Sequence, residues 1–466
     1  MMQPPDHPTT SASGLPEQVI LVGASVRSAA ESAVLAGFDV MGVDLFGDLD
    51  TRSCCRTFCP VDHWCEMTAD RAAQWIQRFR HVSRSPLAAA DGQTRPTGLV
   101  VVGDLQRMSD VLARMPDCVQ VVNDPFPYHT SPLPAELDRA KVASPLGRDL
   151  LGKSVDLCSR DQGGSVRAPE SHLDTADFDS VRSGGRWLVK EYRSAGGLGV
   201  RWLTDDDLAG DDLAGTNHRG RQQNRSMYFQ RWIPGRCYGA TYLSNGSQVS
   251  LLGVCQTVFT RNGDRPFVYA GSYGPVAVSP TQQASLLNLG ERVVANTGMR
   301  GLLNIDFVLD RDGVMWVLEI NPRWSASSEL IERQLAGDRG ESEERGESEE
   351  RGESEDRGSL FRVMHTALRG ASTDNQPLAT GSYQRAAPYY KRIVYSRAKG
   401  RFDRLRLDRE VAGVPLKWEL KDIPSAETEI QPGEPIATII IDIHGSSRFV
   451  WQNAKRLFAA VQKAVV

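Results

Sequence analysis

Residues 302–329, LLNIDFVLDRDGVMWVLEINPRWSASSE, contain two apolar runs on either side of an Asp-Gly pair at 312–313. Such a pair between alternating apolar residues predicts a β-hairpin with a two-residue turn. That register places Asp306 directly across from Glu319, and Asn321 shares their face because side chains alternate along a strand. A four-residue loop would keep the same faces. The opposite face, expected in the core, carries Ile305, Phe307, Leu309, Trp316, Leu318 and Ile320.

Two carboxylates that face each other across paired strands repel one another unless a cation lies between them. Mg²⁺ is bound in proteins by oxygen ligands, commonly one or two carboxylates together with substrate phosphates and water. We therefore predict that Asp306, Glu319 and Asn321 are magnesium ligands. The alternative is a hairpin with a solvated polar face, but solvation alone does not explain the Asn-Pro-Arg sequence at 321–323.

A glycine-rich loop follows a second apolar run in WLVKEYRSAGGLGV, residues 187–200. The predicted strand ends near Lys190, whose ammonium can hold a phosphate, and glycines let backbone N–H groups approach phosphate oxygens closely. The sequence lacks the GxxxxGK[ST] pattern of a Walker A loop. By itself it is equally typical of an ordinary hairpin. The candidate loop residues are Ser194, Gly196, Gly197 and Gly199.

The fold class expected from the whole chain combines α/β and α+β. Residues 18–44 read as a strand, a helix and a second strand, and further apolar strands follow at 97–104 and 118–124. Strands that alternate with helices predict a parallel sheet covered by helices on both faces. From residue 186 onward, runs of strands and one helix at 280–297 predict a domain built on antiparallel sheet.

We expect a flexible tail, a Rossmann-like parallel-sheet domain, a module of two α+β subdomains, a low-complexity acidic insertion, and a C-terminal α+β segment that packs on the other domains. The insertion repeats RGESEE, and its charge and glycines favour a solvated segment. The expected limits of these five parts are 1–17, 18–135, 136–336, 337–359 and 360–466.

Composition narrows the class of partner. The net charge of −4 argues against nucleic acid as the main partner, and no run of apolar residues is long enough to span a membrane. The N-terminus lacks a secretory signal and eight cysteines are few for 466 residues, so we expect a reduced, cytoplasmic protein. One cluster of four cysteines and a histidine lacks the paired CxxC spacing of a zinc site, so we interpret its cysteines as ordinary thiols. Its members are Cys54, Cys55, Cys59, His63 and Cys65.

Order and spacing connect these motifs. The Lys strand and glycine-rich loop are followed after about 40 residues by MYFQRWIPGRC, a strand that ends in a Pro-Gly turn, and after about 70 more by the acidic hairpin. Residues 186–332 thus resemble the ATP-grasp superfamily, in its carboxylate-amine ligase-like branch. The domain before them resembles the one that precedes ATP-grasp modules. The resemblance implies that ATP and Mg²⁺ are cofactors.

The resemblance also implies roles on the nucleotide side. Lys190 would hold the α- and β-phosphates, and the loop from Ser194 to Gly199 would cover the β- and γ-phosphates. Gln230 stands where many members have a Glu that contacts the adenine amino group, and Trp232 or its neighbours would supply the backbone that pairs with adenine. A carboxylate that often contacts the ribose is replaced here by Cys237.

On the side of the transferred phosphoryl group, the hairpin acids would bind one or two Mg²⁺ ions. Arg323 would steady the transferring phosphoryl group or an acyl phosphate. A further phosphate contact at the entry to the module is left open among Lys141, Lys153 and Arg148.

The expected reaction joins a small-molecule carboxylate to an amine through an acyl phosphate, without protein nucleophiles. The identities of both substrates stay open. The oligomeric state also stays open, with a homo-oligomer as one alternative. Tyr269 and Tyr273 could border the acceptor pocket or belong to a plain turn. One rival is an NAD(P)-dependent oxidoreductase, since Gly23 lies 21 residues before Asp44, although VGASVR lacks the other glycines of that fingerprint. The other rival is a catalytically silent nucleotide-binding protein.

Overall fold

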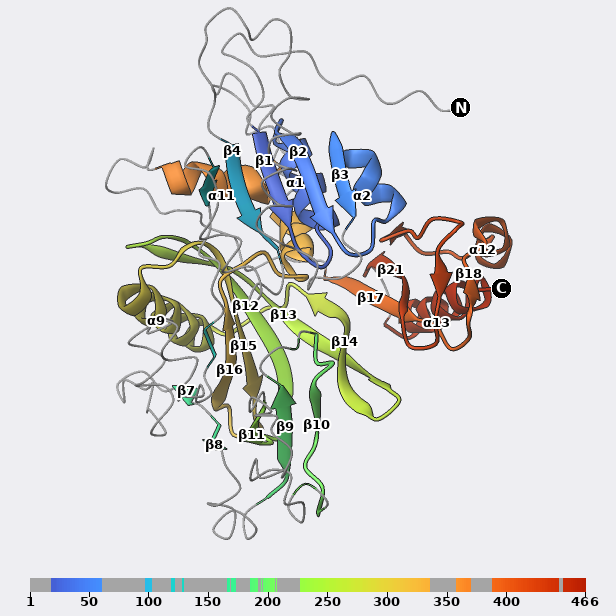
Figure 1. Cartoon of the computed structure of the whole chain (residues 1–466). Coiled ribbons are helices and arrows are strands. Elements are labelled where there is room, and N and C mark those ends of the chain that lie inside the picture. The colour runs from blue at the N-terminus through green and yellow to red at the C-terminus, as the bar shows by residue number, and fades with distance from the viewer. Residues whose placement is uncertain are drawn as a thin grey trace, which may run out of the picture.

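The computed structural model (Figure 1) describes residues 18–60, 97–102, 119–121, 128–129, 166–167, 169–172, 185–191, 194, 196–205, 207, 227–335, 358–369, 388–443 and 447–466. The expected tail, nearly all of the RGESEE insertion, His63, Cys65, Lys141, Arg148 and Lys153 lie outside these residues. Within them, every helix is too short or too polar to cross a membrane.

The first part of the chain forms a five-stranded sheet in which all neighbouring strands are parallel. Its order, β3-β2-β1-β4-β5, confirms the predicted parallel sheet. These elements are stabilised by a shared core, because the apolar residues of the first strand and the alanines of the first helix pack together. The bounds are β1 Gln18–Val22, α1 Arg27–Leu35, β2 Asp39–Asp44, α2 Leu49–Cys54, β3 Thr57–Pro60, β4 Thr97–Val101 and β5 Val119–Val121.

A small antiparallel sheet carries the Lys strand. Its order is β10-β9-β11-β8. One face of it is apolar and holds Trp187, Val189 and Phe229 in a small core of their own. The strands are β8 Ser171–His172, β9 Trp187–Glu191, β10 Val200–Trp202 and β11 Met227–Arg231.

A ten-stranded sheet forms the centre of the molecule and runs β19-β21-β17-β14-β13-β12-β15-β16-β6, with β7 also paired to β16. Two of its pairings cross the expected domain limits, since β6 comes before residue 135 and β17, β19 and β21 come after residue 360. The strands are β6 Tyr128–His129, β7 Val166–Arg167, β12 Arg236–Asn245, β13 Val249–Asn262, β14 Arg265–Gly274, β15 Arg300–Leu309, β16 Met315–Asn321, β17 Tyr389–Tyr395, β19 Trp418–Lys421 and β21 Pro435–Asp442.

Helix α9, Pro280–Thr297, packs on β12 and β13 and has the bounds that the sequence predicts. It begins at a capping box in which Ser279 and Gln282 bond each other's backbone N–H groups, and it ends at Gly298 in the left-handed conformation. These local signals explain why its limits were predictable.

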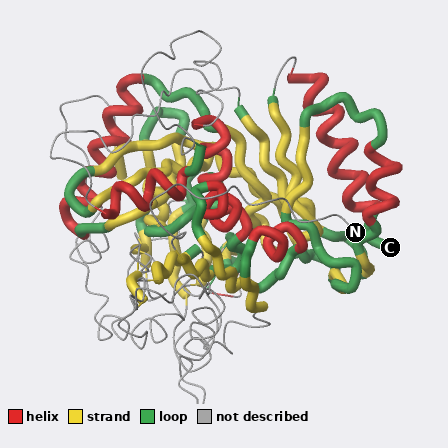
Figure 2. Tube along the Cα trace, turned by 90° about the horizontal axis from the view of Figure 1, so that it is seen from above, coloured by secondary structure: helices red, strands yellow, loops and turns green. Residues whose placement is uncertain are grey.

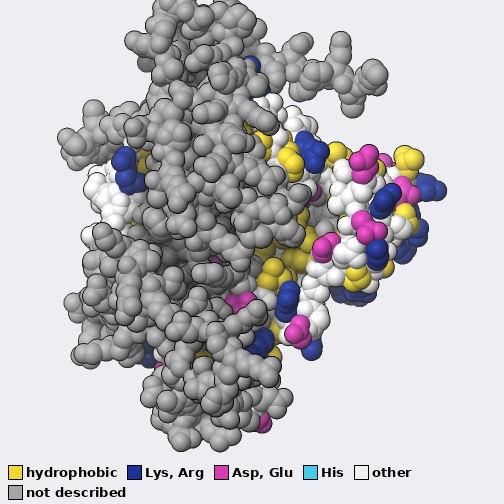
Figure 3. All heavy atoms as spheres, viewed as in Figure 1, with side chains coloured by type: hydrophobic (Ala, Val, Ile, Leu, Met, Phe, Trp, Pro, Cys, Tyr) yellow, Lys and Arg dark blue, Asp and Glu magenta, His cyan; other side chains and the backbone are white. Residues whose placement is uncertain are grey.

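The C-terminal helix α13, Ser447–Lys463, covers β17 and β21, on the side where the C-terminus lies in the view from above (Figure 2). On the described part of the face in Figure 3, basic and acidic side chains are interspersed over these C-terminal elements. The remaining elements are α11 Leu360–Arg369, β18 Gly400–Arg401, α12 Arg404–Val411 and β20 Glu429–Ile430.

The acidic hairpin departs from the prediction at its tip. The turn is not two residues long: Leu309 pairs with Met315, so the loop spans 310–314, and Asp310 organises it by accepting from the amides of Asp312 and Val314, both at 2.9 Å. A register shift between Asp306 and Phe307 then restores the predicted pairing of Asp306 with Glu319.

This shift corrects two predicted core positions. Trp316 and Leu318 are only half-buried, and Met315 and Val317 take their places in the core. The reason is that one extra residue in a strand exchanges its two faces. The indole N–H of Trp316 donates to Asp310 at 2.8 Å instead.

Candidate functional site

The acidic hairpin brings the predicted metal ligands together. Asp306 lies opposite Glu319, which confirms this predicted pair, and Asn304 lies opposite Asn321. Asn304 and Asn321 are buried, whereas the two carboxylates are half-buried and keep some access to solvent. Four oxygen-bearing side chains therefore share one face of the hairpin, on two rungs with the Ile305–Ile320 pair between them.

Asp306 is held between two amides. The Nδ2 groups of Asn304 and Asn321 donate to its two carboxylate oxygens at 2.7 and 3.0 Å. Burial and then the charge of Glu319 raise the pKa of Asp306 to about 7, against a lowering by the Asn304 hydrogen bond. A divalent cation between the two carboxylates would relieve this repulsion and desolvation.

Arg323 stands at the end of the same hairpin. Its Nη2 donates to Oδ1 of Asn321 at 2.9 Å, and its charge lowers the pKa of Asp306. A guanidinium beside a metal site is suited to an anion that shares the metal, because its planar donors match phosphate or carboxylate oxygens.

Lys190 faces the hairpin from the small sheet. Its ammonium lies 6.0 Å from the ring centre of Tyr228, and its charge lowers the pKa of both Asp306 and Cys237. Burial, followed by the charge of Asp306, raises the pKa of Cys237 to about 11. The thiol is thus neutral at physiological pH, and the charges of both Lys190 and Asp306 act on it.

The glycine-rich loop is a hairpin loop between β9 and β10 that lies against β14. The amide of Tyr269 donates to the carbonyl of Gly196 at 2.8 Å. Gly197 has a φ of +75°, and a Cβ atom there would overlap the carbonyl oxygen of Phe267. Gly199 is buried against Ser194, where a Cβ would lie 2.5 Å from the Ser194 side chain. Glycine is therefore required by contact as well as by conformation.

Gln230 and Lys190 share one face of the small sheet. Gln230 pairs with Leu188 and Tyr228 pairs with Lys190, and side chains two residues apart on a strand point to the same side. Gln230 is buried, and its Nε2 lies 3.4 Å from the hydroxyl of Ser171. The face opposite to the apolar core of this sheet therefore carries the polar residues that the sequence singles out.

Trp232, which with its neighbours was expected to supply the backbone that pairs with adenine, is anchored in an aromatic group. Its amide donates to the carbonyl of Arg186 at 2.9 Å, so an adenine edge would have to pair with a neighbouring backbone group. Its ring lies 5.5 Å from that of Trp202, and the Arg186 guanidinium lies 3.5 Å from the Trp202 ring centre.

Sequence reasoning missed two residues of the site. Asn304, two positions before Asp306, could have been found because it shares the face of that carboxylate. Gly239 lies opposite Asp306 on β12, where a Cβ would stand 3.0 Å from Oδ1 of Asp306 and 2.9 Å from Oδ1 of Asn304. Its glycine leaves room beside the acids, and only the strand pairing reveals that.

Tyr269 and Tyr273 belong to strand β14, which corrects the alternative of a plain turn. The Tyr269 hydroxyl lies 2.8 Å from that of Ser272, and burial raises its pKa above the usual range. Tyr273 instead packs against the C-terminal core. The extra residue of a bulge between them separates their surroundings.

The two residues that suggested a dinucleotide site, Gly23 and Asp44, have other roles. Asp44 is buried and accepts from the amides of Gly47 and Val26 at 2.8 and 3.3 Å. A Cβ on Gly23 would overlap the carbonyl of Val102, so packing alone accounts for that glycine. Among the described residues no group of three His, Cys, Asp or Glu side chains could hold a metal ion, and Cys54 and Cys55 are thiols that form no disulfide.

Comparison with known proteins agrees with this architecture. Residues 162–327 match the model of the ATP-grasp domain family. No curated protein matches the sequence. N5-carboxyaminoimidazole synthetase from Staphylococcus aureus, solved with ADP, is similar in structure with a TM-score of 0.56 at 12% identity, over 95% of this chain and 97% of that one.

Two further structures share the fold. N5-carboxyaminoimidazole synthase from Aspergillus clavatus, solved with ADP and 5-aminoimidazole ribonucleotide, has a TM-score of 0.58 at 13% identity, covering 96% of this chain and 99% of that one. Pyruvate carboxylase from Rhizobium etli has a TM-score of 0.59 at 14% identity, over 95% of this chain but 37% of that one. At these identities the likeness establishes the fold.

Proposed function

We propose, from the premise that residues 162–327 of this chain are an ATP-grasp domain, that the protein is a Mg²⁺-dependent ligase that uses ATP to join a carboxylate to an amine. One observation carries the proposal: the opposed carboxylates of Asp306 and Glu319, with Asn321 and Arg323 on the same hairpin and Lys190 facing them. A hairpin without a cation gains nothing from this opposition.

Each residue then has a role in phosphoryl transfer. Lys190 would neutralise the α- and β-phosphates, and the loop over Gly196 and Gly197 would cover the β- and γ-phosphates with backbone N–H groups. The hairpin acids and Asn321 would hold Mg²⁺, which neutralises charge on the phosphates when bound.

The proposed reaction proceeds in two steps. A substrate carboxylate oxygen bonds to the γ-phosphorus while the bond to ADP breaks, which yields an acyl phosphate. The amine nitrogen then bonds to the acyl carbon, inorganic phosphate leaves, and the amine gives up a proton. Arg323 would stabilise the negative charge on the transferred group in both steps, since its guanidinium already lies beside Asn321.

The fold supports small molecules as substrates. The Aspergillus clavatus enzyme of the same fold was solved with ADP and 5-aminoimidazole ribonucleotide. For this chain we propose a small-molecule carboxylate and amine in the cytoplasm, with their identities to be determined by screening.

The first experiment is thermal unfolding of the wild type, Glu319→Ala and Asp312→Ala, each with and without Mg-ATP. A ligand at about 100 times its Kd stabilises a protein by roughly 2.7 kcal/mol. We expect a magnesium-dependent rise in the wild type and in Asp312→Ala, an exposed acid of the same hairpin, and none in Glu319→Ala. An unchanged rise in Glu319→Ala would refute the metal assignment, and a rise with NAD(H) instead of Mg-ATP would favour the oxidoreductase.

Once nucleotide binding is established, ADP release should be measured with a panel of carboxylates and amines. A ligase releases ADP only slowly from Mg-ATP and water, releases it faster when a suitable acid is present, and consumes the amine when both are present. Mg-ATP binding without ADP release across a broad panel would favour a silent nucleotide-binding protein.

A further inference from the structure

A buried arginine joins three distant parts of the chain. Arg27, the first residue of α1, is 1% exposed. Its Nη1 and Nη2 donate to the two carboxylate oxygens of Glu329, both at 2.8 Å, and its Nε donates to Asp422 at 2.6 Å. Glu329 lies eight residues after Asn321 of the acidic hairpin, and Asp422 directly follows β19.

The charges of this cluster compensate one another. Lys391 of β17 donates to Glu329 at 2.6 Å, so two buried cations face the two carboxylates of Glu329 and Asp422. Burial would raise the pKa of Glu329, but Arg27 and Lys391 hold it well below its usual range. Burial likewise opposes the charge of Arg27, yet Asp422 and Glu329 raise its pKa. Arg27, Glu329 and Asp422 therefore stay ionised, and their mutual attraction fixes the geometry of the cluster.

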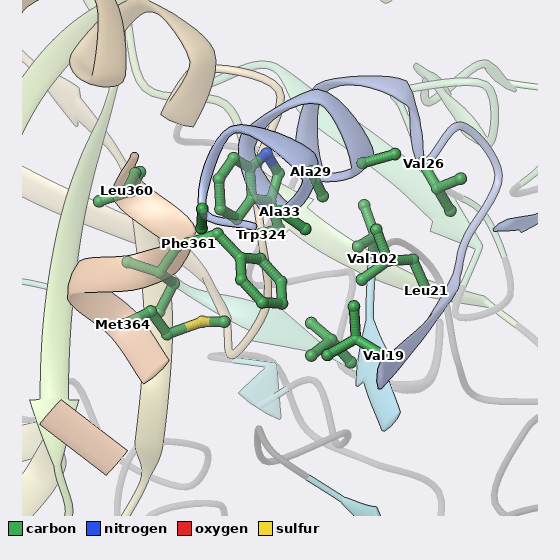
Figure 4. Packing of buried hydrophobic residues seen from close by; sticks show 14 of the residues in the cluster. Val19, Leu21, Val26, Ala29, Ala33, Val102, Trp324, Leu360, Phe361 and Met364 are labelled. Atoms are coloured by element: carbon green, nitrogen blue, oxygen red, sulfur yellow. The ribbon is translucent and has the colours of Figure 1, made fainter. Parts of the chain in front are cut away.

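A second contact holds the same segment against α1. The indole N–H of Trp324 donates to the hydroxyl of Ser28, the neighbour of Arg27, at 3.0 Å. Trp324 is 3% exposed and packs among residues of α1 and α11, including Ala29, Ala33 and Phe361 (Figure 4). The Lys391 ammonium also donates to the carbonyl of Ala326 at 3.1 Å.

The segment 323–329 therefore runs from the metal site to the buried cluster. At its start Arg323 donates to Asn321, and at its end Glu329 is held by Arg27. Since Trp324 is fixed next to Arg323, the path of the intervening backbone depends on the first turn of α1 and on β17.

We propose that Arg27 is a positioning residue: together with Lys391 it holds segment 323–329 in the conformation that keeps the Arg323 guanidinium at the metal site. The consequence for turnover rests on the proposed function, whereas the hold on the segment does not. The first domain would then contribute to the phosphoryl-transfer site without touching the nucleotide.

Hydrogen exchange tests the hold directly and needs no substrate. In Arg27→Met we expect amides of peptides covering 324–331 to exchange about tenfold or more faster, with peptides of β15 within about twofold of the wild type. The matched control is Arg56→Met, whose arginine pairs with Asp39 at 2.7 Å on the surface of the same domain. Unchanged exchange in 324–331 for a folded Arg27→Met would overturn the proposal, whatever the outcome for ATP.

Kinetics then separates positioning from plain stability, with Mg-ATP and water as the only reactants. We expect Arg27→Met to lower kcat for ADP release about tenfold or more while KM for ATP changes by less than about threefold. A kcat equal to that of Arg56→Met would refute the role in turnover. If the wild type neither binds nor hydrolyses Mg-ATP, the proposed function fails, and the exchange result still decides whether Arg27 holds the segment.

The double variant Arg27→Met/Glu329→Leu covers the case in which Arg27→Met alone does not fold. Removal of both charges leaves Lys391 to compensate Asp422, and Glu31, which also accepts from Arg27 at 2.8 Å, keeps its partner Lys421 at 3.0 Å. Apolar replacement of a buried ion pair is often neutral for stability. We expect the melting temperature to return toward that of the wild type while kcat stays low and exchange in 324–331 stays fast. Recovery of both kcat and slow exchange would show that the Arg27–Glu329 ion pair has no positioning role and only neutralises two buried charges.

Discussion

The carboxylate of Asp306 lies directly opposite that of Glu319, with an asparagine amide donating to each oxygen of Asp306. The protein thus places a like-charge pair next to two buried amides, where its repulsion is only partly screened. Such an arrangement favours cation binding over the stability of the metal-free chain.

Glu319→Gln should stabilise the metal-free protein and abolish its response to Mg-ATP. Removing one of two opposed charges relieves repulsion worth about 0.2–1 kcal/mol, but it also removes a metal ligand. Differential scanning calorimetry in EDTA and in Mg-ATP measures both effects. The control is Glu291→Gln, an exposed carboxylate on α9. A destabilised apo variant that still responds to Mg-ATP would contradict the arrangement.

The pH dependence of stability should identify Asp306. Its pKa is about 7 in the folded chain against about 3.9 for an unfolded Asp, so the folded state binds this proton more tightly and loses stability as pH rises from about 4 to 7. Asp306→Asn should therefore gain on the order of 1–2 kcal/mol relative to the wild type between pH 5 and pH 8, after allowance for its partial exposure.

Urea unfolding in EDTA at the two pH values measures this difference. Asp312→Asn, on the exposed loop of the same hairpin, should show no such change. An identical effect of Asp306→Asn at pH 5 and pH 8 would mean that Asp306 is not the titrating group.

Gly197→Ala should weaken ATP binding far more than Gly196→Ala. Both glycines have positive φ, so each substitution carries a backbone cost of about 1 kcal/mol. Only at Gly197 would the new methyl overlap the carbonyl of Phe267, whereas a Cβ at Gly196 meets nothing within 4 Å. We expect at least about a tenfold larger Kd for Gly197→Ala, measured by nucleotide competition. Equal losses would show that contact with β14 does not set the loop position.

Gly239→Ala should impair magnesium binding without unfolding the chain. The methyl would come within 3.0 Å of Asp306 Oδ1 and would displace side-chain oxygens instead of backbone. Gly253→Ala, also in the ten-stranded sheet, places its methyl 3.2 Å from the side chain of Ile331, away from the acids, and serves as control. When the ATP-induced thermal shift is titrated with Mg²⁺, the midpoint should move to a higher Mg²⁺ concentration only in Gly239→Ala.

Much of the fold was predictable because it depends on local signals. Apolar strands that alternate with a helical stretch predicted the parallel sheet from β1 onward, and the helix predicted at 280–297 has the bounds of α9, where a capping box and Gly298 mark its ends. The same reasoning failed at Trp316 and Leu318, because it assumed an uninterrupted register. A five-residue loop and a compensating bulge leave the acid pair in place while exchanging the faces above it.

The sequence by itself determined that Asp306 faces Glu319 across the hairpin, since strand alternation and a nearby turn carry that information within about 20 residues. Only the tertiary structure decided that Gly239 makes room beside Asp306 and that Arg27 meets Glu329 and Asp422. Arg27 is separated from these partners by 302 and 395 residues. No periodicity links residues so far apart, because their contact follows from how whole sheets pack and from the need of a buried charge for a partner.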